Sequence, residues 1–126
     1  MKSIISNYDV QNTTDRLEGI IADHGFIVVT RVDHAGAATR VNLELRPSQL
    51  IIFGNPKIGS LLMQSEQLVG LDLPLKFLVW QDENGVTKIS YDEPSDIKMR
   101  RNVAGQEDVF EKMTGALNSM ASAAAE

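Results

Sequence analysis

Cysteine is absent from this chain of 126 residues. Its absence excludes disulfide bonds, thiolate metal sites and cysteine nucleophiles. The chain has only two histidines, so a zinc site built from protein side chains alone is hard to assemble. A chain of this length buries roughly two-thirds of the surface that its unfolded form exposes, so it can hold a core without cross-links. We therefore expect one domain over residues 1–126, with no metal and no cofactor.

Long apolar runs are also missing. No segment approaches the ~20 apolar residues that a membrane-spanning helix needs. The first ten residues carry one lysine and no apolar stretch of the kind found in secretory signals. The sequence therefore predicts a cytoplasmic protein that does not bind a membrane.

Concentrated positive charge is a third missing feature, because the net charge is −5. The only local basic cluster lies within residues 98–101, and acidic residues lie beside it within 92–96. Nucleic-acid binding usually requires a concentrated basic surface. We expect this segment to be a solvated surface of mixed charge, and we expect no nucleic-acid partner.

Periodicity at the start of the chain predicts two strands with a helix between them. Residues 3–10 alternate apolar and polar side chains as a strand does. The helix that follows has Asn12 or Thr13 as a possible N-cap, and Gly25 fits the left-handed residue that ends it. Residues 26–32 form the second predicted strand.

The middle of the chain carries the densest local signals. Asp33 can cap a short helix, and Asn42 can adopt the positive φ angle that ends it. The strand predicted over residues 49–53 is apolar on both faces, so it should lie inside a sheet. Asn55 is a plausible N-cap for the next helix, with Pro56 at the first helical position.

A hairpin and a long helix complete the predicted fold. Asn84-Gly85 is typical of a two-residue turn after the strand 75–81. If the turn has two residues, Trp80 pairs with Ile89 and Leu78 pairs with Tyr91. These four side chains then share one face of the hairpin. Residues 104–124 keep the spacing of an amphipathic helix, and residues 121–126 should fray at its end. The order of elements favours an α+β domain, in which an antiparallel sheet of four to five strands carries the first and last helices on one face.

Short motifs spread over nearly the whole chain form one distinctive set. They are Gly25-Phe26, Asp33-His34, Leu45-Arg46-Pro47, Phe53-Gly54-Asn55-Pro56, Gly59-Ser60, Leu62-Met63, Leu71-Asp72-Leu73-Pro74-Leu75-Lys76, and Tyr91 with Pro94. This set resembles that of the domain of unknown function 302 family, which is found widely in bacteria and archaea. The resemblance implies a compact α+β domain with an antiparallel sheet that forms a homodimer. It implies no established activity.

Polar residues that interrupt apolar patterns are the candidate ligand contacts. We expect them to gather around one pocket at the ends of the strands. There His34 would hydrogen-bond a small polar or anionic ligand, and Lys76, held by Asp72, would supply positive charge. The predicted ligand-binding set is His34, Asn55, Ser60, Asp72, Lys76 and Tyr91. The leading hypothesis is binding without catalysis.

Each of these residues also has a structural interpretation. An N-cap at Asn55 and close packing at Gly59 explain the helix start without a ligand, although an anion could bind there. The segment does not match the P-loop of nucleotide hydrolysis, because Ser60 stands where that motif has its lysine. Asp72 could form an ion pair, and the spacing of Asp33, His34 and Asp72 is not a metal signature.

Two further function classes stay open. In the first, the protein is an enzyme that uses His34 as a general acid/base on a small substrate. In the second, it is a homodimeric interaction module whose motifs lie at the subunit interface.

Overall fold

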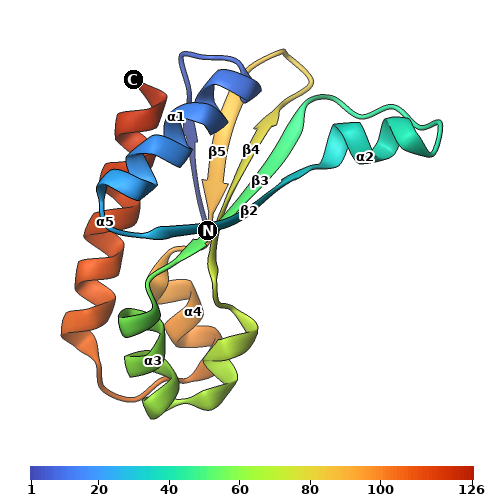
Figure 1. The fold of residues 1–126 in the computed structure, drawn as a ribbon. Helices are drawn as coiled ribbons and strands as arrows, with labels where there is room; N and C mark the ends of the chain where they lie inside the picture. The colour runs from blue at the N-terminus through green and yellow to red at the C-terminus, as the bar shows by residue number, and fades with distance from the viewer.

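The computed structural model describes residues 1–126 and contains one five-stranded antiparallel sheet, in the order β1-β5-β4-β3-β2 (Figure 1). The strands are β1 (Lys2–Ile5), β2 (Ile27–Asp33), β3 (Ser48–Gly54), β4 (Leu75–Gln81) and β5 (Thr87–Tyr91). The α-helices are α1 (Val10–Asp23), α2 (His34–Arg40), α3 (Pro56–Ser65), α4 (Pro94–Arg101) and α5 (Glu107–Ala125), and η1 (Gln67–Leu71) is a 3-10 helix. This architecture confirms the predicted α+β class and the antiparallel sheet.

Helices α1 and α5 contact each other and cover one face of the sheet (Figure 1). This arrangement confirms the prediction that the first and last helices share a face. The core is one contiguous cluster of 22 buried residues, most of which lie between these layers, and it extends to α3, η1 and α4 through Leu62, Val69 and Ile97. At one end of the sheet α2 projects from the body, and α3 and α4 lie beyond the opposite end (Figure 1).

The first helix begins earlier than the sequence predicted. The Oδ1 of Asp9 accepts a hydrogen bond from the backbone N–H of Asn12 at 2.7 Å, so Asp9 is the N-cap. Thr13 is buried inside the helix, and its hydroxyl lies 2.7 Å from that of Ser6. The prediction of a cap at Asn12 or Thr13 was wrong because both residues lie inside the helix.

The register of the β4–β5 hairpin differs from the prediction by one residue. Val79 pairs with Ile89, and Trp80 pairs with Lys88. The backbone N–H of Asp82 donates to the carbonyl of Val86 at 2.9 Å, so the loop between them has three residues rather than two. A shift of one residue moves every β5 side chain to the other face of the sheet relative to the side chains of β4. Ile89 therefore shares a face with Val79 rather than with Trp80.

Helices α4 and α5 show three further differences from the prediction. The whole of α4 was missed, although Glu93 and Asp96 form a capping box at its start. Helix α5 starts at Glu107 because Gln106 has a positive φ of 61°. At its other end α5 continues to Ala125, whereas fraying was expected over residues 121–126. Ala121 and Ala124 are fully buried there.

None of the helices combines the length and the apolar character that crossing a bilayer requires.

Candidate ligand-binding site

An apolar cavity of ≈ 380 Å³ lies between the start of β2, helix α3 and the start of β4; we call it the α3 cavity. Its walls include Phe26, Ile27, Val29, Ile58, Met63 and Leu73. Met113 of helix α5 also lines it. The side chains come from segments far apart in the sequence, and the antiparallel pairing of β2, β3 and β4 brings them together.

Asn55 positions one wall of the α3 cavity. Its side-chain oxygen accepts hydrogen bonds from the backbone N–H of Lys57 at 3.0 Å and of Ile58 at 3.2 Å. These contacts confirm the prediction of an N-cap followed by Pro56 at the first helical position. The N–H of Gly59 donates to the carbonyl of Asn55 at 2.9 Å. The first turn of α3 therefore has no free N–H group to offer an anion, because proline has none.

Two of the six predicted site residues, Asn55 and Ser60, line the α3 cavity. Because Oδ1 of Asn55 caps the helix, its Nδ2 amide is the group left to contact a ligand. The hydroxyl of Ser60, which can both donate and accept, lies one turn further along α3. All other residues that line the cavity are apolar, proline or glycine.

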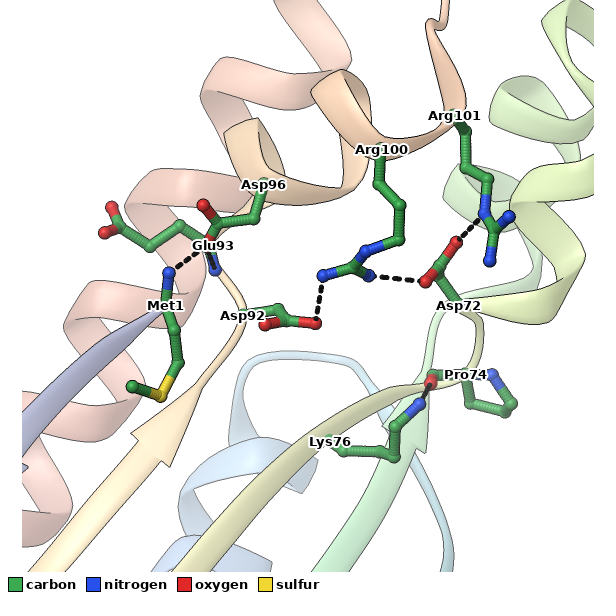
Figure 2. Close-up of polar contacts among 9 residues, drawn as sticks. All are labelled: Met1, Asp72, Pro74, Lys76, Asp92, Glu93, Asp96, Arg100 and Arg101. Carbon is green, nitrogen blue, oxygen red and sulfur yellow. Dashed lines mark hydrogen bonds and ion pairs between the residues drawn. The ribbon is translucent and has the colours of Figure 1, made fainter.

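Asp72 forms ion pairs with two arginines from α4 (Figure 2). Each of its two oxygens lies 2.6 Å from a guanidinium nitrogen, one of Arg100 and the other of Arg101. Arg100 also reaches Asp92 at 3.1 Å. Burial alone raises the pKa of Asp72, but the hydrogen bonds from Arg101 and Arg100 outweigh it and hold the pKa below its ordinary value. The network ties α4 to the turn that precedes β4.

Lys76 is not the partner of Asp72, contrary to the prediction. Its Nζ donates to the carbonyl of Pro74 at 3.2 Å, and the side chain lies apart from the arginine pairs (Figure 2). Lys76 and Asp72 line a separate cavity of ≈ 40 Å³, which is too small for the predicted ligand. The spacing of four residues does not bring the two charges together, because the intervening chain is a turn that enters a strand rather than a helix.

His34 lies at the opposite end of the sheet from Lys76. It is the first residue of α2, directly after Asp33, which pairs with Gln49 in the sheet, whereas Lys76 pairs with Ile52. The side chain of Asp33 caps α2 by accepting from the N–H of Gly36 at 2.9 Å, as predicted. His34 lines none of the four principal cavities. An acid/base role for it stays a prediction.

Tyr91 is a core residue. Its ring packs edge-to-face on Phe77 with centroids 5.0 Å apart, and its hydroxyl donates to Asn118 at 2.6 Å. Burial raises the pKa of Tyr91, which keeps the phenol protonated and able to donate. The six predicted residues therefore do not surround one cavity. No group of three or more histidine, aspartate or glutamate side chains could hold a metal ion.

The chain matches the family described as "Domain of unknown function DUF302" over residues 2–120. The chain belongs to the DUF302 family. A crystal structure of a conserved DUF302 protein from Bacillus stearothermophilus superposes with a TM-score of 0.88 at 22% identity, covering 98% of this chain and 96% of that one. That likeness supports the fold.

Curated relatives of this DUF302 domain occur in Brucella. The chain is 36% identical over 107 residues to "Fluoride-specific ion channel FluC 1" of Brucella suis biovar 1 and to the protein of the same name in Brucella abortus biovar 1. The match covers 85% of this chain but only 42% and 40% of those two proteins. The chain therefore spans less than half the length of the curated relatives it matches.

Several of the motifs that carry the DUF302 resemblance contribute residues to the α3 cavity, whereas Asp33-His34, Leu45-Arg46-Pro47 and Tyr91 with Pro94 do not line it. Residues 53–63 supply its polar edge and much of α3, and residues 71–76 supply Leu73 and Pro74 opposite. The sequence interpretation missed Phe26 and Met63 as cavity residues. Both stand in the motif set, within Gly25-Phe26 and Leu62-Met63, so the motifs were the available signal.

Proposed function

We propose that this DUF302 domain binds a small molecule in the α3 cavity and does not catalyse a reaction. The observation that carries the proposal is a cavity of ≈ 380 Å³, within the range of about 300–1,000 Å³ typical of ligand sites. Its walls are mostly apolar with two polar side chains, Asn55 and Ser60, as is usual for such sites. No residue that lines it is ionisable, so the site offers no general acid or base.

Native mass spectrometry tests this function directly. Protein purified from its own host should carry a bound small molecule that adds a discrete mass and is lost on denaturation. The test variant is Met63→Trp, which places an indole in the cavity and should lower the occupancy of the ligand. Its matched control is Met99→Trp, on the exposed surface of α4. Met63 is 37% exposed and Met99 is 83% exposed, so both variants should fold. Equal occupancy in the two variants would contradict binding in the α3 cavity.

A second candidate function is an accessory role for a fluoride channel. The supporting observation is that a region similar to this chain forms part of Brucella proteins named fluoride-specific ion channels. Joining two modules in one polypeptide raises their effective concentration for each other, which is useful when they act together. A domain of the same type could therefore act together with such a channel.

A growth assay tests the fluoride role. Deleting the coding region of this domain alone should increase the sensitivity of the host to sodium fluoride, and restoring the wild-type region should restore growth. Sodium chloride at the same concentration is the control for general salt stress. Unchanged fluoride sensitivity after deletion would count against this role and would leave the small-molecule proposal intact.

The homodimer implied by the family resemblance is also a proposal, and the segment after α2 supports it. Val41, Leu43 and Leu45 are 63%, 63% and 58% exposed. Exposed apolar side chains that gather in one segment often mark an interface. We expect Leu43→Asp to convert a dimer to a monomer, as measured by light scattering after gel filtration. Thr39→Asp, on the neighbouring exposed surface of α2, is the charge-matched control. A wild-type monomer at high micromolar concentration would refute the dimer.

A further inference from the structure

We propose that the ligand of the α3 cavity is an uncharged molecule with an apolar body and one hydrogen-bonding end. This inference rests on the function proposed above and names the chemical class of the ligand. It replaces the polar or anionic ligand that the sequence suggested.

The composition of the walls argues against an ion in the cavity. The residues that line it include no lysine, arginine, histidine, aspartate or glutamate. An ion that lies against these walls gains no partner of opposite charge for the hydration that it loses, which is unfavourable. Lys76, the cation that the sequence assigned to the ligand, donates instead to the carbonyl of Pro74 at 3.2 Å.

The start of α3 does not supply an alternative anion site. Helix N-termini bind anions through free backbone N–H groups. In α3 the N–H groups of Lys57 and Ile58 donate to Asn55 Oδ1, and that of Gly59 donates to the Asn55 carbonyl. An anion would have to displace the N-cap, which costs about 1 kcal/mol.

The apolar walls fit a hydrocarbon or aromatic body. Phe26, Ile58 and Leu73 are rigid or branched, whereas Met63 and Met113 have flexible side chains that can adapt to a ligand. The volume of ≈ 380 Å³ is more than twice the ~150 Å³ of an apolar cavity that binds benzene. The body can therefore be larger than a single aromatic ring.

The polar edge defines the other end of the ligand. The Nδ2 amide of Asn55 can donate, and the hydroxyl of Ser60 can donate or accept. An alcohol, amide or carbonyl oxygen at this edge would find a donor at both residues. A ligand with a neutral oxygen at one end and an apolar body is the class that satisfies both parts of the site.

Three probes with the same eight-carbon tail separate these ligand classes: 1-octanol, octanoate and octylammonium at pH 7.5. We expect 1-octanol to shift amide resonances of residues 55–63 and 73–75 in ¹⁵N spectra and to raise Tm. Octanoate and octylammonium should bind at least about tenfold more weakly, because their charges find no partner. Tighter binding of octanoate than of 1-octanol would overturn the inference but not the function. Absence of binding by 1-octanol would also overturn the inference, whereas the function itself would be rejected by native mass spectrometry that finds no bound small molecule.

Two variants locate the 1-octanol site. Met63→Trp should abolish the resonance shifts, and Met99→Trp should leave them unchanged. Ser60→Ala should weaken the binding of 1-octanol about three- to tenfold, which is the change in affinity expected from the loss of one hydrogen bond. Shifts of equal size in Met63→Trp and in the wild-type protein would place the probe elsewhere and overturn the assignment.

Discussion

Phe77→Ala is expected to lower the free energy of unfolding by about 4 kcal/mol, a large part of the total stability of a domain of this size. Phe77 is fully buried. It stacks on Phe53 with ring centroids 4.9 Å apart and packs edge-to-face on Tyr91 at 5.0 Å. Truncation leaves a cavity at the centre of the sheet that the rigid strands on either side cannot close. Urea unfolding followed by circular dichroism measures the change.

Trp80→Ala provides the control for Phe77→Ala. Trp80 lies on the other face of β4, where its indole N–H donates to Ser90 at 2.8 Å and the ring is half-buried. We expect a loss of about 1–2 kcal/mol for this variant, because less apolar area is removed from contact. The register predicted from the sequence would place Trp80 on the same face as Ile89. A larger loss for Trp80→Ala than for Phe77→Ala would therefore favour that register and contradict the observed pairing.

Features that depend on a few neighbouring residues could be predicted from the sequence. The caps at Asp33 and Asn55 were identified because the signal and its partner lie within three residues of each other. The positive φ of Asn42, observed at 63°, was identified for the same reason. The interior position of β3 followed from a strand that is apolar on both faces.

The hairpin shows where local signals become ambiguous. Asn84-Gly85 occurs in two-residue turns and also in three-residue loops that end on a left-handed glycine. Here the side chain of Asp82 accepts hydrogen bonds from the N–H groups of Asn84 and Val86, both at 2.9 Å, and Gly85 has a φ of 80°. These contacts select the longer loop. The dipeptide alone could not distinguish the two, so the predicted register was one residue out.

The six predicted site residues do not surround one cavity, and the sequence could not show this because the partners of the polar residues lie far away in the sequence. Asp72 bonds to Arg100 and Arg101, which follow it by 28 and 29 positions. The sequence offered Lys76 as the nearest cation instead. An apolar residue that faces a cavity also looks the same in sequence as one that faces the core. The α3 cavity therefore became visible only when the strands and α3 were placed in space.

Asp72→Asn is expected to lower the free energy of unfolding by about 2 kcal/mol at pH 7 and low salt. The side chain of Asp72 is only 10% exposed, and its two oxygens each bond to an arginine. Removing the carboxylate leaves Arg100 and Arg101 without the charge between them, so they repel each other. The arginines are partly exposed, which lets water recover some of the loss and keeps the effect below that of a fully buried pair. Urea is the denaturant of choice, because a salt would screen the ion pairs.

Asp92→Asn is the matched control for Asp72→Asn. Asp92 also pairs with Arg100, at 3.1 Å, but both side chains are more than 40% exposed. Exposed pairs of this kind contribute little, so we expect a loss of about 0.5 kcal/mol or less. Equal losses for the two variants would show that burial of Asp72 does not strengthen its ion pairs.

The pH dependence of the Asp72→Asn effect tests the mechanism. The arginine hydrogen bonds, which outweigh burial, hold the pKa of Asp72 below its ordinary value in the folded protein. A carboxylate with a lowered pKa stabilises the fold above its unfolded pKa, near 3.8, and this contribution is lost as the pH falls through the folded pKa. Protonated aspartic acid and asparagine are both neutral, so the difference in stability between wild type and variant should shrink steadily below about pH 4. Asp82 and Asp96, whose pKa values are also lowered, contribute equally to both proteins and cancel in the comparison. A difference that stays constant from pH 7 to pH 2 would mean that the variant is destabilised by altered packing rather than by loss of the ion pairs.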